Sequence, residues 1–193
     1  MKKIIKILPV IIAMVILSGC GAGQNSGNAN LKAYEGGEFT ISIDPTWKVI
    51  SQSDFYADIP QETVVAFTAP EAYDGFFINV NIIKEDLKQP VSALDYARAN
   101  INMSGQNLTD YEKIQEAKID LGNTPSLVHI FQARLNPTEN LIRFVQVYAT
   151  DGNSGYIVTG GMLPTTPKEL RDEVGAIVTS FRLKSNEVIA PAE

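Results

Sequence analysis

The only histidine of the chain, His129, is the first residue to consider for chemistry. A single histidine cannot form the multi-histidine sites typical of zinc, but it is enough for a Ser-His-Asp triad. The sequence contains no G-x-S-x-G turn, and its serines lie in predicted linkers, turns and helix caps. His129 shares a strand parity with Leu127, Phe131 and Ala133. We therefore predict a core or edge histidine with a hydrogen-bonded ring nitrogen.

Carboxylates are densest at two places, Asp54 with Asp58 and Glu85 with Asp86. Paired carboxylates catalyse glycoside hydrolysis, so a hydrolase is one hypothesis for this chain, and the least favoured. Both groups fall in predicted loops, and neither has the spacing and glycine of a calcium-binding loop. Solvated surface acids are the favoured interpretation. The sequence thus predicts no catalytic residues, no metal ligands, no cofactor and no enzymatic activity.

Three aromatic residues, Trp47, Phe55 and Tyr56, lie close together around the segment DFYADIP. An aromatic loop of this kind can form a ligand pocket or a surface for a protein partner. In a small domain such residues more often close one end of the core. We keep both interpretations, and take the three residues as a tentative ligand or partner surface.

The only cysteine, Cys20, follows a segment with the layout of a secretory signal peptide. The start MKKIIK is basic, residues 7–17 are apolar throughout, and Ser18 and Gly19 are small. A helix that spans a bilayer needs about 20 apolar residues. This run is too short to span one, and Pro9 interrupts it.

The sequence Leu17-Ser18-Gly19-Cys20 resembles the bacterial lipobox. The resemblance implies that the Cys20 sulfur carries lipid and that cleavage makes Cys20 the new N-terminus. A diacylglyceryl group supplies two acyl chains, which is the number that stable anchoring requires. A free thiol and an intermolecular disulfide are the alternatives. We predict attachment to the cell membrane at its extracytoplasmic face.

The composition separates four segments and argues against a nucleic-acid partner. The chain has 16 basic and 22 acidic residues, a formal net charge of −6, and three of its lysines lie in the predicted signal peptide. Binding to nucleic acid requires clustered Lys and Arg, which this acidic chain lacks. Residues 21–30 are rich in Gly, Asn and Ser. The predicted segments are a signal peptide (1–19), a lipidated cysteine with a flexible linker (20–35), one globular domain (36–184) and a C-terminal tail (185–193).

Apolar periodicity predicts alternating strands and two separate helices in the globular part. The predicted strands are Phe39–Ile43, Thr63–Thr68, Phe76–Ile83, Glu112–Leu121, Ser126–Leu135, Leu141–Thr150 and Tyr156–Met162, and a further strand or a turn begins at Trp47. Ser92 and Asp95 resemble a capping box at the start of a helix over 92–104. Thr166 and Pro167 predict the N-cap and first residue of a final helix. Strand 126–135 is apolar at both parities, so we expect it to be central and covered on both faces.

This order of elements predicts an α+β fold, a three-layer α/β/α sandwich around a mainly antiparallel sheet of about six or seven strands. The order also resembles that of the PsbP-like domains, from about residue 36 to residue 184. These domains include the photosystem II extrinsic protein, the Mog-type Ran-binding proteins and the DcrB-type bacterial lipoproteins. The residues that carry the resemblance are Phe39, Ile41, Pro45, Trp47, Tyr156, Ser180, Phe181 and Arg182.

The resemblance implies a central antiparallel sheet between helices and a non-enzymatic accessory or binding role. With the lipobox, it predicts a membrane-anchored extracytoplasmic lipoprotein that binds an envelope protein. The alternative is a carrier of a small ligand or lipid, with a pocket between sheet and helix near the aromatic loop. A hydrolase acting through Asp54 and Glu85 is the third possibility.

Overall fold

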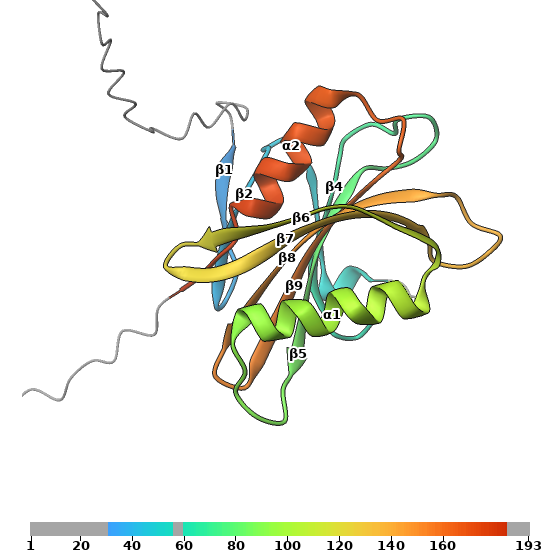
Figure 1. Ribbon diagram of the computed structural model, residues 1–193. Helices are drawn as coiled ribbons and strands as arrows, with labels where there is room; N and C mark the ends of the chain where they lie inside the picture. The colour runs from blue at the N-terminus through green and yellow to red at the C-terminus, as the bar shows by residue number, and fades with distance from the viewer. Residues whose placement is uncertain (1–30, 56–59, 185–193) are drawn as a thin grey trace, which may run out of the picture.

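The computed structural model describes residues 31–55 and 60–184, and within them one large sheet carries most of the strands (Figure 1). This sheet has seven strands in the order β3-β4-β5-β9-β8-β7-β6, and every neighbouring pair is antiparallel. Its strands are β3 (Lys48–Ser51), β4 (Thr63–Thr68), β5 (Asn79–Asp86), β6 (Thr109–Leu121), β7 (Thr124–Arg134), β8 (Ile142–Asp151) and β9 (Ser154–Met162). A 3-10 turn, η1 (Gln52–Asp54), follows β3.

A second, smaller sheet joins the two ends of the folded domain. It contains β1 (Lys32–Glu35), β2 (Phe39–Ile43) and β10 (Arg182–Leu183), in the order β1-β2-β10. The backbone N–H of Ser42 in β2 donates to the Ser180 hydroxyl, 2.8 Å away, just before β10. Residues separated by most of the chain therefore lie side by side in this sheet.

Short turns connect β6 to β7 and β8 to β9, so the strands of each pair run antiparallel. Gly122 between β6 and β7 has φ of +71°, and Gly152 between β8 and β9 has φ of +54°. A side chain is strained at such angles, so glycine suits both turns. The strands β4 and β5 also pair antiparallel, across the segment 69–78.

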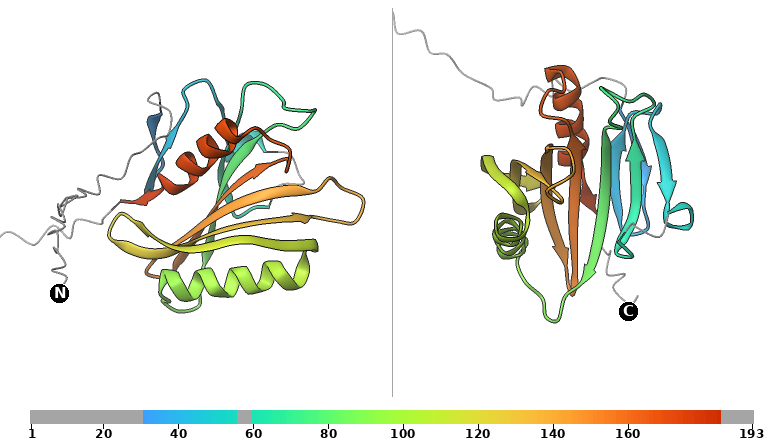
Figure 2. Two further views of the ribbon diagram at one scale, coloured as in Figure 1. Left: turned by 45° about the horizontal axis from the view of Figure 1, so that its top comes forward. Right: turned by 90° about the vertical axis from the view of Figure 1, so that its right-hand side faces the viewer.

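The large sheet lies between two outer layers, as Figure 2 shows from two directions. Helix α1 (Ala93–Asn107) packs on one face, against β7 and β8. Helix α2 (Lys168–Thr179) packs on the other face, against β8 and β9, and the small sheet lies on that side too. The predicted three-layer α+β architecture is confirmed. The small sheet beside α2 is an addition that the residue pattern did not predict.

The strand covered on both faces is β9, in which eight of nine residues are buried. The expectation that strand 126–135 would hold this position is wrong, because β7 lies next to the edge strand β6. One face of β7, with Leu127 and Phe131, is buried under α1. Its other face, with Val128 and Ile130, is only half-buried on the α2 side. The apolar pattern indicated a covered strand, but the coverage is unequal.

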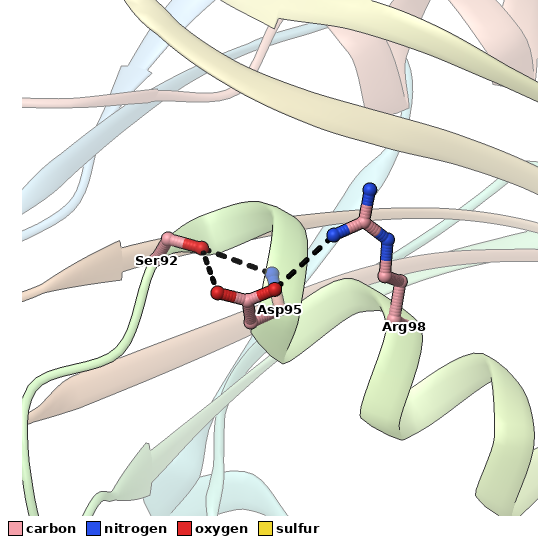
Figure 3. Close-up of polar contacts among 3 residues, drawn as sticks. All are labelled: Ser92, Asp95 and Arg98. Carbon is pink, nitrogen blue, oxygen red and sulfur yellow. Dashed lines mark hydrogen bonds and ion pairs between the residues drawn. The ribbon is translucent and has the colours of Figure 1, made fainter.

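The start of α1 is the one that the capping box predicted. The Ser92 hydroxyl accepts the backbone N–H of Asp95 at 3.1 Å and donates to the Asp95 carboxylate at 2.7 Å (Figure 3). Arg98 adds an ion pair to the same carboxylate at 3.1 Å. These contacts satisfy a backbone donor that the first helical turn otherwise leaves free.

The start of α2 differs from the prediction by one residue. Pro167, in an extended conformation with ψ of 151°, is the N-cap, and the helix begins at Lys168. Thr166 is fully buried, and its hydroxyl has no hydrogen-bond partner within the described residues. The threonine side chain packs into the domain because Pro167 continues the extended chain for one more residue.

The folded domain also begins earlier than predicted. The expected linker extends to residue 35, but Lys32–Glu35 forms β1, which pairs with β2 from Lys32–Ile43 to Glu35–Thr40. Tyr34 anchors this strand, because its ring packs edge-on against Phe67 at a centroid distance of 5.0 Å. The predicted signal peptide, Cys20 and the tail 185–193 lie outside the described residues. Neither α1 nor α2, the helices of the described segments, has the length and apolar character of a membrane span.

Candidate functional site

A groove of about 600 Å³ lies between α2 and the large sheet, and we take it as the candidate functional site. Its floor is apolar and comes from three neighbouring strands, with Val128 and Ile130 of β7, Val145 of β8 and Met162 of β9. Ile114 of the edge strand β6 also lines it and is 44% exposed. The groove therefore places accessible apolar surface beside a helix.

Helix α2 forms one wall of the groove with a single stripe of side chains. The lining residues of α2 are Lys168, Arg171, Asp172, Gly175, Ala176 and Thr179. Their spacing of three and four residues puts them on one helical face. The opposite apolar stripe, with Leu170, Val174 and Val178, packs into the core. The first turn of the groove face is thus charged, and the later turns carry small side chains.

Two glycines explain why α2 closes on β9 but leaves the groove open. A Cβ on Gly160 of β9 would lie only 2.3 Å from Cγ1 of Val174, so the helix rests directly on this strand. A Cβ on Gly175 would meet nothing within 4 Å. The helix is therefore in tight contact with β9 on one flank and faces open space on the other.

Arg143 of β8 carries a positive charge for which the described protein supplies no partner. Its Nε is buried and has no hydrogen-bond acceptor, and no carboxylate within the described segments forms an ion pair with it. Its strand parity is that of Val145 and Val147, which face α2. A buried Nε–H without an acceptor has a free-energy cost, because it has lost its contact with water and gained no hydrogen bond.

The other charges of the groove leave it cationic. Lys168 forms an ion pair with Asp172 one helical turn later. Arg171 donates from Nη1 to the backbone carbonyl of Thr166 at 2.7 Å, a contact that leaves its charge unneutralised. Arg143 and Arg171 thus give the groove positive charge in a chain whose net charge is −6. Guanidinium groups bind carboxylates and phosphates through paired hydrogen bonds, so the groove is suited to an anion.

On the opposite face of the sheet, the polar side chains are bonded to one another. The hydroxyl of Tyr111 lies 2.9 Å from Nε2 of His129, and Nδ1 of His129 lies 3.4 Å from the Tyr148 hydroxyl. Tyr148 donates to Gln146 Oε1 at 2.8 Å, and Gln146 Nε2 donates to the Thr159 hydroxyl at 3.0 Å. We call these five residues the polar row.

His129 is the centre of the polar row and a core residue, as predicted. It is fully buried and stacks on Phe131 with ring centroids 4.4 Å apart. Because Tyr148 donates its proton to Gln146, it accepts from His129 Nδ1, which leaves Nε2 to accept from Tyr111. Burial lowers the pKa of His129 to about 4 and raises the pKa values of Tyr111 and Tyr148. The histidine is therefore neutral at pH 7.

Two of the acidic residues named in the sequence analysis, Asp54 and Glu85, accept hydrogen bonds from other side chains. Asp54 lies in η1 and accepts a hydrogen bond from Ser51 at 2.6 Å, while Asp58 lies outside the described residues. Glu85 accepts from the Tyr96 hydroxyl at 2.6 Å, and burial is the main cause of the raised pKa of Tyr96. Asp86 is exposed at the end of β5. The described segments contain no group of three or more His, Cys, Asp or Glu residues placed to hold a metal ion.

The tentative aromatic surface is divided in the structure. Trp47 belongs to the core, with 7% of its surface exposed, and its ring N–H donates to Glu173 at 3.1 Å. Burial and the nearby Asp44 carboxylate raise the pKa of Glu173. Phe55 follows η1 at the other end of β3, and Tyr56 lies outside the described residues. Trp47 lines a second cleft of about 340 Å³ instead, with Pro70, Tyr73 and Leu170 among its other lining residues.

The groove residues were absent from the sequence-based prediction of the site. Arg143 had a detectable signal, because it is a cation at the strand parity of apolar core residues. Arg171 and Gly175 had none, since a charged residue and a glycine on the outer face of a helix are common features. Arg171 and Gly175 line the groove only because of the distance between α2 and β7, which the sequence does not predict.

Comparisons with known proteins support the fold but do not identify a function. No protein-family model matches the sequence, and no curated protein is significantly similar to it. The cyanobacterial PsbP protein CyanoP from Synechocystis sp. PCC 6803 has a similar solved structure, with a TM-score of 0.56 and 13% identity over 86% of this chain and 99% of that chain. A mutant of the protein Mog1 matches with a TM-score of 0.50 and 15% identity over 83% of this chain and 100% of that chain.

The chain therefore has the α+β fold of the PsbP and Mog1 structures, and the predicted resemblance is confirmed at the level of fold. At 13% and 15% identity, the likeness does not transfer a function.

Proposed function

We propose that this chain is a lipoprotein anchored through Cys20 to the extracytoplasmic face of the cell membrane, with a non-catalytic accessory role in binding an envelope protein. The signal-peptide layout, the lipobox resemblance and the Gly/Asn/Ser linker support the anchor. The fold shared with PsbP and Mog1 is compatible with such a role. The binding surface in this proposal is the groove beside α2.

One observation carries the binding role. The polar row on the α1 face satisfies its members internally, whereas the groove on the α2 face holds guanidinium groups that the described protein does not neutralise. Polar groups buried with partners stabilise a fold, and unpartnered ones beside apolar surface are typical of binding sites.

Photo-crosslinking in intact cells tests this proposal directly. A photoreactive amino acid at position 168, on the rim of the groove, is expected to capture a reproducible envelope protein identified by mass spectrometry. The same group at position 98 on α1, where Arg98 is similarly exposed, is the matched control. A protein captured equally from both positions, or none from position 168, contradicts binding at the groove.

The anchor has a separate test. The substitution Cys20→Ser removes the predicted lipid attachment and is expected to move the protein from the membrane fraction to the medium or the periplasm. The circular dichroism spectrum of the domain should not change, because residue 20 precedes the described fold. If the variant stays with the membrane after a carbonate wash, the lipid anchor is wrong.

A second candidate function is a carrier of a small ligand or lipid. The groove favours it through its size, since about 600 Å³ lies within the range of about 300–1,000 Å³ found for small-molecule sites. The apolar floor formed by Val128, Ile130 and Val145 also suits an aliphatic ligand. The predicted location between sheet and helix matches the groove, although the aromatic loop does not line it.

A further inference from the structure

We propose that the groove binds a small anionic amphiphile, with its carboxylate or phosphate head on Arg143 and Arg171 and its aliphatic chain along Val128, Ile130 and Val145. This inference rests on the second candidate function, the small-ligand carrier. It adds the chemical class of the ligand and the residues that select it.

The head group follows from the hydrogen-bonding state of the two arginines. Among the described residues, the buried Nε of Arg143 finds no acceptor, and Arg171 has only a backbone carbonyl for its Nη1. Two guanidinium groups that share a groove repel each other unless an anion lies between them. A carboxylate or phosphate supplies acceptors for both and forms the paired hydrogen bonds that arginine favours. Of the lining residues that the structure describes, Asp172 is the only carboxylate, and it is already paired with Lys168.

The aliphatic chain follows from the floor. Val128 and Ile130 are half-buried on the face of β7 that α2 leaves uncovered, and Ile114 extends this apolar strip to the sheet edge. Each methylene that leaves water for such a surface contributes favourably to binding. The small wall residues Gly175 and Ala176 leave room for the chain beside the helix.

The net charge of the protein makes this site distinctive. A chain with a net charge of −6 repels anions from most of its surface, so a cationic groove selects its ligand against that background. A neutral amphiphile would use the floor but leave both guanidinium groups unpaired. The expected ligand is therefore distinguished from a neutral one by the head group alone.

Site-mapped photolabelling tests the inference on the mature lipidated protein, which begins at Cys20. The protein is held in nanodiscs of phosphatidylcholine, which has no net charge, and exposed to dodecanoate or dodecyl phosphate carrying a diazirine on the chain. Dodecanol with the same diazirine is the neutral control. Peptide mapping by mass spectrometry is expected to place both anionic labels on the groove residues Ile114, Gln115, Val128 and Ile130, and the dodecanol label there at least about tenfold more weakly. A difference between the two anionic probes distinguishes a fatty-acid ligand from a phosphorylated lipid.

Two variants separate the head group from the chain. Arg143→Gln is expected to lower anionic labelling of the groove about tenfold and to leave dodecanol labelling unchanged. Gly175→Leu fills open space on a helical face and is expected to abolish labelling by all probes without loss of folding. Arg98→Gln removes an exposed arginine of α1 and is expected to change nothing.

The outcomes distinguish this inference from the proposed function. Equal groove labelling by dodecanol and the anionic probes, or no groove labelling, overturns the anionic amphiphile. If position 168 captures a protein under those conditions, the protein-binding role stands and the amphiphile does not. If the anionic probes label the groove but position 168 captures no protein, the inference stands and the carrier replaces the protein-binding role.

Discussion

The polar side chains on the two faces of the large sheet differ in their hydrogen bonding. Under α1, the polar row runs across β6, β7, β8 and β9, and each of its side chains is hydrogen-bonded to the next. Under α2, Arg143 occupies the neighbouring parity of β8 and has no hydrogen-bond partner within the described chain. The same strand therefore presents a satisfied Gln146 to one layer and an unsatisfied arginine to the other.

We take this difference to distinguish the polar groups that stabilise the fold from the polar groups of the candidate binding site. A buried polar group without a partner costs about 1–3 kcal/mol, so a network that satisfies all of its members contributes to one well-defined fold. A cation that the protein leaves unpaired carries that cost until a ligand binds. We therefore expect changes on the α1 face to affect stability and changes in the groove to affect binding.

The largest expected effect is from His129→Ala on the α1 face. The change leaves a cavity beside Phe131 and removes the partners of Tyr111 and Tyr148, so the free energy of unfolding should fall by about 3–4 kcal/mol. Urea denaturation measures the loss. The matched change Arg143→Ala should alter the free energy of unfolding by less than about 1 kcal/mol in either direction, because no side-chain partner within the described residues is lost. Equal losses for the two variants would contradict the contrast between the faces.

The pH dependence of stability is the next largest effect. Burial lowers the pKa of His129 from 6.5 to about 4, while Glu116 raises it and Lys113 lowers it to smaller extents. Between these two pH values the unfolded chain binds a proton that the folded chain excludes. Stability should therefore fall by about 2–3 kcal/mol as the pH drops from 6.5 to 4. The variant His129→Gln should lack this part of the pH dependence in a series of denaturation curves. Parallel curves for the two proteins would show that His129 does not titrate as expected.

Gly160→Ala tests the closed flank of the α2 face. Its new methyl would lie 2.3 Å from Val174 Cγ1, so α2 must shift away from β9. Overpacking of this kind costs about 1–3 kcal/mol, measurable as a lower midpoint of thermal unfolding. An unchanged midpoint would mean that α2 does not rest on β9 as closely as described.

Gly175→Ala tests the open flank and should have the smallest effect, with the opposite sign. The methyl meets no atom within 4 Å, and alanine in a helix interior is favoured over glycine by up to about 1 kcal/mol. The unfolding midpoint should rise by a few degrees. A lower midpoint would indicate that the groove is narrower than the open space beside Gly175 implies.

Much of the fold was predictable because local signals there agree with the tertiary structure. The predicted strands and both helices occur in the described chain, and Ser92 caps α1 as its spacing with Asp95 indicated. The errors lie where packing overrides local pattern. Thr166 has the residue type of an N-cap but is buried, and β1 has no apolar alternation yet pairs with β2. The apolar pattern of β7 was consistent with a central strand, but periodicity does not encode strand order.

Sequence reasoning placed His129 in the core but did not locate the groove. His129 was correctly placed in the core, because its parity neighbours are apolar and local. The groove draws on β6, β7, β8, β9 and α2, which are separated by up to about half of the domain in sequence. Such long-range proximity depends on the order of strands in the sheet and on the distance between α2 and the sheet. Residue spacing predicts neither of them.

The sequence by itself determined the class of fold, the turns between successive strands and the N-cap of α1, and it predicts a lipid anchor at Cys20. These features depend on residues within a few positions of one another, where sterics and hydrogen bonding act locally. Only the tertiary structure decided which strand is central and that Arg143 faces a groove. It also decided that Gly160 and Gly175 give α2 one closed flank and one open flank. These depend on contacts between distant segments, whose free energies exist only once the chain has folded.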